Sequence, residues 1–399
     1  MILVLADDLA GAAEMGGMAW RHGLSAEVRT GAGLDLESRG SPDTGVDVLV
    51  LDTNTRSCDP REARRRMHAV AAHCQQWAPR GVYKKVDSVL RGPVAAELDA
   101  LLDALGFERC LLVPANPGLG RVISGGQYLL HGVPLHETDF RLDPEYPATT
   151  ADVLARVATS GADAVGELSL RAVGETLPER GIVVGEAACA ADLASWAALA
   201  VRVGVLAAGA SEFFGAYLKA LGHPPAKPVP ESRSDGERRD LFVCGSTSAG
   251  SREFCRKSEA RGVPVVRLPK GLLRQPAAEA GAEALVNQWG NEIVAALSNY
   301  SRVVAAIDRP LCLEPGMPQV LGEYLGAAVE QALARIHVER LFAEGGATAA
   351  ALVRRMGWTC LRVRREWATG VVTCEVHGQD APLVSMKPGS YAWSAAILD

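Results

Sequence analysis

The chain has 399 residues, of which 48% are hydrophobic and 22% are charged, and its formal net charge is −6. This length favours two domains, and the composition is ordinary for a globular protein. The weak negative charge argues against non-specific binding to nucleic acid or to a membrane surface, and no run of 18 apolar residues suggests a transmembrane helix.

The amino-terminal half alternates short apolar runs with helical patterns. Strands are expected at 1–6, 46–53, 82–88, 109–115, 181–187 and 201–208, and helices at 9–23, 60–78, 94–106 and 211–222. Residues 1–6 lack the basic start and long apolar region of a secretory signal. Asp59 and Pro60 are typical of a helix start. Near-continuous apolar strands between helices indicate a mostly parallel sheet that is covered on both faces.

The alternation stops at a segment rich in proline and charge and then resumes. Residues 226–240 are predicted to be a linker between a first domain, 1–225, and a second domain, 241–399. Strands are expected at 241–245, 263–269, 302–308 and 340–346, and three shorter ones, some of them antiparallel, at 360–367, 370–376 and 382–388. The sequence therefore predicts two α/β domains with mostly parallel sheets.

Charged side chains gather after the predicted strands of the first domain, where ligands of open α/β sheets bind. Asp7 and Asp8 follow the first strand, and the next candidates lie at Lys84, Lys85, Asp87, Ser88 and Arg91. Arginine can bind a carboxylate with two hydrogen bonds, and the aspartates can bind hydroxyls, accept a proton or help to hold Mg²⁺. The two lysines point to opposite faces of a strand, so one of them is expected to serve the site. The structural alternatives are a helix cap for Asp8 and an ion pair near a helix start for Arg91.

In the second domain, the residues that follow the predicted strands are mainly glycine, serine and threonine. The loops around Gly245, Gly345 and Gly389 expose backbone N–H groups before predicted helices or turns, which suits a phosphate group. Each loop alone is also compatible with an ordinary turn. The chain has neither the GxxxxGK[ST] motif nor a GxGxxG after a strand, which disfavours a P-loop protein and a dinucleotide-dependent oxidoreductase.

Six segments of the chain resemble the four-carbon acid sugar kinase family. They are ADDLAGAAE, YKKVDSVLRGPVAAELDA, VPANPGLGRVISGGQYLLHGVPLHETDFRLDP, GSTSAGSRE, EGGATAAALVRRMG and VSMKPGSYAW. The resemblance spans nearly the whole chain. It implies a sugar-acid-binding domain followed by a nucleotide-binding domain, with the active site in the cleft between them, and transfer of the γ-phosphate of ATP to a hydroxyl of a small acid.

The resemblance also implies roles for individual residues. The pair of like charges opposite the segment that carries the lysines and Arg91 makes Asp8 the expected catalytic base, with Asp87 as the other candidate. The expected substrate-binding residues are Asp7, Lys84, Lys85, Ser88, Arg91 and His136, and the segment of His136 is alternatively a surface crossover. The expected nucleotide-binding residues are Ser246, Ser248, Gly345, Gly346, Thr348 and Gly389. The expected cofactors are ATP and Mg²⁺, the metal ligands are left open, and a homodimer is an open possibility.

Three positions depart from the family pattern. Ala10 replaces a threonine beside the aspartates, Ala347 replaces an acidic residue after the glycine pair, and residues 387–392 differ from the usual last loop. These departures motivate an alternative, a catalytically degenerate member that binds sugar acid or nucleotide without phosphoryl transfer. The nine cysteines form no CxxC pair, which favours free thiols and a cytoplasmic location.

Overall fold

The computed structural model describes residues 1–31, 45–143, 145–161, 167–227, 238–246, 248–273, 280–308, 317–389 and 393. The chain forms two compact units, residues 1–228 and 229–399. Both are α/β units with mostly parallel sheets, as the sequence predicts. The predicted limits of the linker stay a prediction, because residues 228–237 lie outside the described residues.

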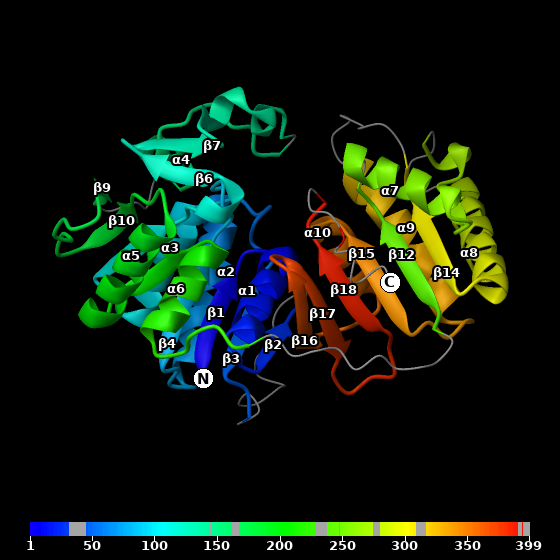
Figure 1. Cartoon of the computed structure of the whole chain (residues 1–399), viewed down its shortest axis with the longest axis horizontal. Coiled ribbons are helices and arrows are strands. Elements are labelled where there is room, and N and C mark those ends of the chain that lie inside the picture. Colours follow the sequence, from blue (N-terminus) through cyan, green and yellow to red (C-terminus); the bar gives the residue numbers. More distant parts are fainter. Residues whose placement is uncertain are drawn as a thin grey trace. The chain divides into compact units, whose positions relative to one another are not determined.

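Unit 1 is built on a sheet of parallel strands in the order β2-β3-β1-β4-β11-β5-β10-β9 (Figure 1). The strands are β1 (Ile2–Ala6), β2 (Ala26–Arg29), β3 (Val48–Asp52), β4 (Gly81–Lys85), β5 (Arg109–Val113), β9 (Leu168–Arg171), β10 (Gly181–Gly185) and β11 (Leu206–Gly209). β1 is apolar and buried throughout, and β3 and β5 are buried runs of mainly apolar residues apart from Asp52 and the partly exposed Arg109, because helices cover both faces of the sheet.

Helices of unit 1 pack in two groups. α1 (Leu9–Arg21) and α5 (Ala190–Val203) both contact α6 (Ser211–Ala220), whereas α2 (Pro60–Gln75) and α4 (Val153–Ala158) both contact α3 (Val94–Leu105). Asp59 caps α2 by accepting hydrogen bonds from the N–H groups of Arg61 and Glu62, and Pro60 occupies the first turn, as the sequence predicts.

A small antiparallel sheet follows β5 and was not expected from the sequence. It consists of β6 (Arg121–Ser124), β7 (Gln127–Leu130) and β8 (Val133–Pro134). In Figure 1 it lies at the top of unit 1, where the parallel strands end. The hydroxyl of Tyr128 donates to the carbonyl oxygen of Ser88, so the small sheet is attached to the loop after β4.

One predicted strand is partly wrong. Residues 201–203 form the last turn of α5, and β11 begins at Leu206. Val201 and Val203 are exposed on that turn, so their β-branched side chains do not mark a buried strand. Gly204 ends the helix in the left-handed conformation, which costs glycine little.

Unit 2 has the strand order β13-β14-β12-β15-β18-β17-β16. Its elements are β12 (Asp240–Cys244), α7 (Ala249–Ala260), β13 (Val265–Arg267), α8 (Ala280–Asn299), β14 (Arg302–Ala306), α9 (Met317–Leu333), β15 (Arg340–Glu344), α10 (Gly346–Arg355), β16 (Cys360–Ala368), β17 (Val371–Val376) and β18 (Leu383–Lys387). Strands β13, β14, β12, β15 and β18 are parallel to one another. Strand β17 is antiparallel to both of its neighbours, which confirms the prediction for the tail.

The core of unit 2 includes a stack of aromatic rings. Phe242 and Phe342 lie parallel with 4.3 Å between ring centroids, and Trp393 meets both rings edge-on.

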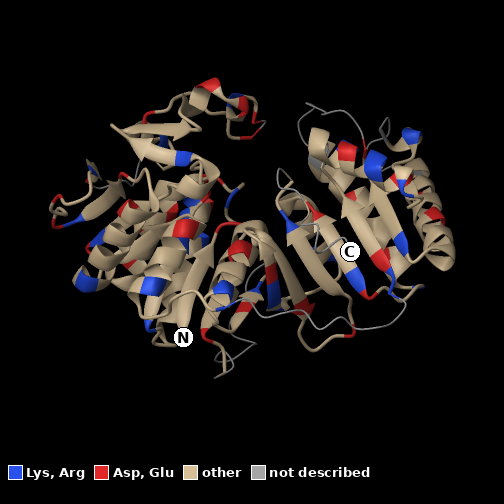
Figure 2. Ribbon diagram, viewed as in Figure 1, with Lys and Arg blue, Asp and Glu red and all other residues tan. Residues whose placement is uncertain are grey.

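Figure 2 shows that charged residues of both units lie mainly on helices and at the ends of strands. None of the described helices is long and apolar enough to cross a membrane.

Candidate functional site

Adjacent strands of unit 1 bring the predicted acidic residues together. β1 lies between β3 and β4, and Ala6 is in register with Asp52 and Lys85 (Figure 1). The segments that follow these three strands therefore start at one edge of the sheet. Asp7 and Asp8 come from the first of them and Asp87 comes from the third.

Arg56, in the segment after β3, is the centre of this cluster. Its Nε and Nη2 donate to Oδ2 and Oδ1 of Asp7 at 2.7 and 2.9 Å. Its Nη1 lies 2.8 Å from Oδ2 of Asp8 and 3.6 Å from Oδ1 of Asp87. One guanidinium thus contacts three carboxylates. Arg56 follows a predicted strand but is not among the predicted site residues, because no spacing pattern reveals which strand ends are neighbours.

The three carboxylates differ in their affinity for a proton. Burial raises the pKa of Asp7, but the positive charges of Arg56, Lys84 and Lys85, together with the hydrogen bonds from Arg56, outweigh burial, so this pKa is lowered. Burial also raises the pKa of Asp8, where Arg56 offsets it only in part and the charge of Asp7 adds to it, so this pKa is raised. Burial raises the pKa of Asp87 too, but Arg91 and Arg56 bring it well below its usual range. Asp8 is therefore the best proton acceptor of the three.

Asp8 is also the most accessible of the three carboxylates. Its side chain is 26% exposed, against 2% for Asp7 and 8% for Asp87. Its Oδ1 accepts a hydrogen bond of 2.7 Å from the N–H of Gly11 and so caps α1, which confirms the structural alternative for this residue. Its Oδ2 lies 2.8 Å from Nη1 of Arg56, and the exposed fraction of the side chain leaves part of the carboxylate accessible to a ligand.

Arg91 is engaged in an ion pair with Asp87, the structural role that the sequence analysis gave as the alternative to substrate binding. Its Nε and Nη2 donate to Oδ2 and Oδ1 of Asp87 at 3.0 and 2.7 Å, and its Nη1 donates to Oδ2 of Asp143 at 3.2 Å. The two-pronged edge of this guanidinium is therefore already engaged by a carboxylate. Its role in substrate binding stays a prediction.

Lys84 and Lys85 point to opposite faces of β4, as predicted. The Nζ of Lys84 lies 2.9 Å from Oε2 of Glu97 on α3, and both side chains are fully buried. The Nζ of Lys85 lies 3.4 Å from Oε2 of Glu14 on α1 and donates to the carbonyl oxygen of Val86 at 2.9 Å. Lys85 shares its face with α1, whose cap is Asp8, so this placement favours Lys85 for the site.

Ser88 and His136 lie in different surroundings. The hydroxyl of Ser88 accepts a hydrogen bond from Nη1 of Arg121, at the start of β6. The side chain of His136 is 40% exposed, and its Nε2 lies 3.8 Å from Oε1 of Glu137. No hydrogen bond or ion pair within the described ranges joins His136 to the aspartates around Arg56. Substrate contact by His136 stays a prediction.

Asp52, the last residue of β3, lies at a predicted strand end but is not among the predicted site residues. It is 5% exposed. Burial, and then the charge of Asp8, raise its pKa to about 7, although the N–H of Asn54 and the hydroxyl of Thr30 donate to its carboxylate. A carboxyl group that titrates near neutral pH therefore lies close to Asp8.

The three predicted glycine loops of unit 2 meet after neighbouring strands β12, β15 and β18. The N–H of Gly345 donates to the carbonyl oxygen of Lys387 at 2.9 Å. A Cβ on Gly245 would lie 1.9 Å from Oγ1 of Thr348, and a Cβ on Gly389 would lie 3.1 Å from Oγ of Ser246. The loops pack so closely that they leave no room for a side chain at Gly245.

Two helices begin at these loops. Ser248 caps α7 by accepting a hydrogen bond of 3.2 Å from the N–H of Ser251, and Gly345 is the cap of α10. Gly346 and the buried Thr348 lie in the first turn of α10, where Ala347 is exposed and no acidic residue is present. Unneutralised N–H groups at the start of a helix favour an anion such as phosphate.

A buried ion pair lies directly beneath the loops. Glu344 and Lys387 end β15 and β18 in register, and Oε2 of Glu344 lies 3.3 Å from Nζ of Lys387. Both side chains are almost fully buried. Burial lowers the pKa of Lys387, and Glu344 opposes this shift. The sequence analysis missed the pair, because it depends on the order of the strands.

Magnesium fits this chemistry mainly through the phosphates of a nucleotide. The described ranges hold no group of three histidine, cysteine, aspartate or glutamate side chains that could bind a metal. Mg²⁺ commonly binds substrate phosphates and water with only one or two carboxylates from the protein. A phosphate-bound Mg²⁺ is therefore compatible with the site.

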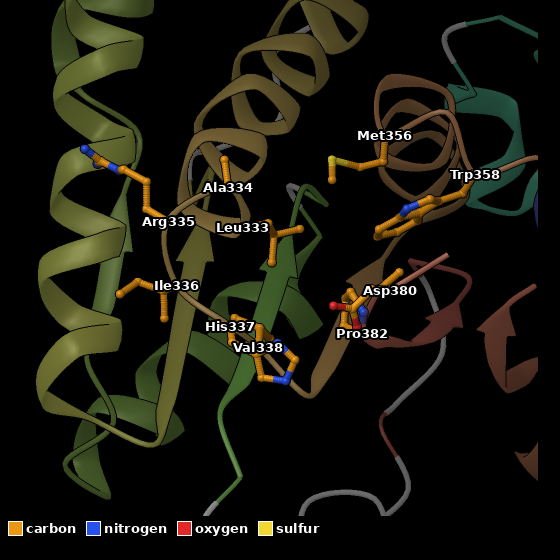
Figure 3. A pocket seen from close by; sticks show the side chains of 11 residues that line it. Leu333, Ala334, Arg335, Ile336, His337, Val338, Met356, Trp358, Asp380 and Pro382 are labelled. Atoms are coloured by element: carbon orange, nitrogen blue, oxygen red, sulfur yellow. The ribbon is translucent and has the colours of Figure 1, made fainter. Parts of the chain in front are cut away.

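The linings of two cavities include neither the glycines of these loops nor the aspartates around Arg56. One, of about 290 Å³, is lined by the segment 333–338 and by Met356, Trp358 and residues 380–382 (Figure 3). It lies where β15 and β18 begin, at the opposite end of those strands from Gly345 and Gly389. The other, of about 280 Å³, is in unit 1 and is lined by residues that include Gly92, Tyr146 and Arg156.

Comparison with known proteins identifies both parts of the chain. A family model described as a sugar-binding N-terminal domain matches residues 2–217, and one described as a nucleotide-binding C-terminal domain matches residues 241–391. A D-threonate kinase of Cupriavidus necator is 32% identical over 99% of this chain and 96% of its own length. A D-erythronate kinase of Heliobacterium modesticaldum is also 32% identical, over 63% of this chain and 58% of its own length.

Solved structures show the same fold. One from Salmonella typhimurium, titled a putative tRNA synthase, aligns with a TM-score of 0.75 and 17% identity over 98% of this chain and 96% of that one. A protein of Haemophilus influenzae aligns with a TM-score of 0.69 and 20% identity over 98% and 97% of the two chains. At this identity the likeness concerns the fold alone.

Proposed function

Because this chain belongs to the four-carbon acid sugar kinase family, we propose that it is an ATP-dependent kinase that phosphorylates a hydroxyl group of a small sugar acid. The D-threonate and D-erythronate kinases among its relatives suggest a substrate of four carbons or a similar size. The catalytically degenerate alternative has less support, because the relatives that match nearly the whole chain carry kinase names.

The observation that carries the proposal is the environment of the Asp8 carboxylate. It is a partly exposed carboxylate with a raised pKa at the carboxyl end of a parallel strand, and Arg56 holds it beside two carboxylates with lowered pKa values. A general base of this kind suits the removal of a proton from a hydroxyl group.

The transfer needs accurate positioning and charge neutralisation more than covalent chemistry. The hydroxyl oxygen of the acid forms a bond to the γ-phosphorus of ATP, the bond from that phosphorus to the bridging oxygen breaks, and Asp8 accepts the hydroxyl proton. Mg²⁺ bound to the phosphates supplies charge neutralisation. We assign ATP to unit 2, because its loops offer the N–H groups of two helix starts and the close packing of Gly245 and Gly389. Transfer of the γ-phosphate then requires that the ATP of unit 2 and the acid of unit 1 come together, and this step is part of the proposal.

Residue roles follow from this assignment. Asp7, Lys85, Ser88, Arg91 and His136 are proposed to bind or position the acid, with Lys84 acting through its buried pair with Glu97. Asp87 is the other candidate base, although its lowered pKa makes it a weaker proton acceptor than Asp8. The nucleotide-binding residues are proposed to be Ser246, Ser248, Gly345, Gly346, Thr348 and Gly389.

The test is a substrate screen with the full chain. ADP release is measured with ATP·Mg²⁺ and a panel of acids of four to six carbons, and thermal shifts are measured with the same acids, because a ligand that binds only the folded state raises its stability. At least one four-carbon acid is expected to stimulate ADP release. Binding of acids with no ADP release across the panel would favour the degenerate alternative.

Gly245→Ala is expected to weaken ATP binding by about 10- to 100-fold, because the added Cβ would overlap Oγ1 of Thr348 and move a phosphate loop. Gly250→Ala is the matched control, since its Cβ would meet no atom closer than 3.9 Å. Calorimetric titration with ATP measures both affinities. Equal affinities for Gly245→Ala and the unmodified chain would remove this loop from the nucleotide site.

Location and assembly complete the proposal. We propose a cytoplasmic protein, because the eight cysteines in the described ranges are free thiols, which persist in a reducing compartment. A homodimer is proposed as its assembled form, and light scattering of the full chain measures it directly.

A further inference from the structure

The basic side chains near Asp8 differ in whether a carboxylate neutralises them. Arg56 and Arg91 are each paired with aspartates, and Lys84 and Lys85 are each paired with a glutamate. Arg121 differs from these four, because no carboxylate of the described ranges lies within 4.0 Å of its guanidinium nitrogens. Its Nε is buried and has no hydrogen-bond partner there.

The fold holds Arg121 in a defined position. It is the first residue of β6 and is joined to Asn116 by two backbone hydrogen bonds of 2.7 and 3.2 Å. Its guanidinium lies 5.7 Å from the centroid of the Phe140 ring, and its Nη1 donates to the hydroxyl of Ser88. The hydroxyl of Tyr128 on the neighbouring strand β7 donates to the carbonyl oxygen of Ser88. Two residues of one hairpin therefore fix the guanidinium against the loop after β4.

This loop is linked to the proposed base through Asp87 and Arg56. Ser88 follows Asp87 in the sequence. The Nη1 of Arg56 lies 3.6 Å from Oδ1 of Asp87 and 2.8 Å from Oδ2 of Asp8. A four-carbon acid carries its carboxylate only a few bonds from its hydroxyl groups. A carboxylate bound near Ser88 therefore leaves the rest of the molecule to extend towards Asp8.

We propose that Arg121, together with the hydroxyl of Ser88, binds the carboxylate of the sugar acid and sets the preference of the enzyme for an acid over a neutral polyol. This inference rests on the proposed function. A partly buried guanidinium without a counter-ion gains most from an anionic ligand, and a carboxylate matches its planar hydrogen-bond donors. Arg91 suits this role less well, because Asp87 already occupies its two-pronged edge.

The chain offers a matched control in Arg156. No carboxylate of the described ranges lies within 4.0 Å of this arginine either, and its Nε is likewise buried without a hydrogen-bond partner there. Its Nη2 and Nη1, however, donate to the carbonyl oxygens of Val89 and Thr150. It also lines the cavity of unit 1. Arg156→Gln is therefore expected to leave the preference for an acid unchanged.

The experiment compares threonate, or the best acid of the screen, with the four-carbon polyol threitol. Steady-state kinetics of the full chain give kcat and KM for each compound in the unmodified protein and in Arg121→Gln, Arg121→Lys and Arg156→Gln. Arg121→Gln is expected to raise KM for the acid by about 10- to 100-fold, with a smaller change in kcat and no comparable loss with threitol. Arg121→Lys is expected to recover part of the preference, because it keeps the charge.

Two results would overturn the inference. One is an unchanged KM for the acid in Arg121→Gln. The other is an equal loss with acid and polyol, which would indicate a structural role for the arginine. An unmodified protein that phosphorylates no acid would instead reject the proposed function, so the two failures are distinguishable.

Discussion

Replacement of Asp8 by asparagine is expected to lower kcat by about 10²- to 10⁴-fold, which is the usual contribution of general acid–base catalysis. Asparagine cannot accept the hydroxyl proton, but it caps a helix about as well as aspartate, so α1 and its cap on Gly11 are expected to persist. The KM for ATP is expected to change little. Stopped-flow or steady-state measurement of ADP release gives kcat, and a turnover close to normal would reject Asp8 as the base.

The pH profile identifies the base independently. Because the pKa of Asp8 is raised, kcat is expected to fall on acidification at a higher pH than an ordinary aspartate with a pKa of about 3.9 would allow. Asp87 has a pKa well below this value, so a profile that stays flat down to about pH 4 would favour Asp87. The acid limb is expected to disappear in the residual activity of Asp8→Asn.

Replacement of Arg56 by methionine is expected to lower the free energy of unfolding by about 3–5 kcal/mol, the usual cost of removing one partner of a buried ion pair. The loss arises because three carboxylates at the strand ends, those of Asp7, Asp8 and Asp87, lose a common counter-charge. Arg65→Met is the matched control, because Arg65 is 70% exposed and pairs with Glu62 on the surface of α2. The control is expected to unfold like the unmodified protein.

The loss in Arg56→Met is expected to depend on pH. Arg56 lowers the pKa of Asp7 in the folded protein, so this part of the stability is present above the pKa of an unfolded aspartate and is lost as the pH falls through the lowered folded value. The difference between variant and unmodified protein is therefore expected to be largest near pH 7 and to shrink on acidification. Urea unfolding at several pH values measures it. A difference that does not change with pH would mean that the side chain acts through packing.

The fold was largely predictable because its signal is local. Buried parallel strands are short apolar runs, and the start of α2 is marked by Asp59 and Pro60. The small sheet β6–β8 was missed, because its strands are short, partly exposed and close to glycine turns. The end of α5 was assigned to a strand because Val201 and Val203 are apolar, although both are exposed.

The candidate site was predictable only in part. The aspartates and the glycine loops follow strands in sequence, so their place at the carboxyl edge could be inferred. The contacts of Arg56, and the pairs Lys84–Glu97 and Glu344–Lys387, join residues that are far apart in sequence. They depend on which strands are neighbours, and the local patterns of the sequence do not reveal the order of strands in a sheet.

The most direct measurement follows the terminal phosphate of ATP. The full chain is incubated with threonate, or the best acid of the screen, and with ATP labelled in the γ-phosphate, and mass spectrometry locates the label. We expect one labelled phosphate ester on a hydroxyl group of the acid for each ADP released. Label found only as free phosphate, or on the carboxylate as an acyl phosphate that hydroxylamine traps, would contradict the assignment as a sugar-acid kinase.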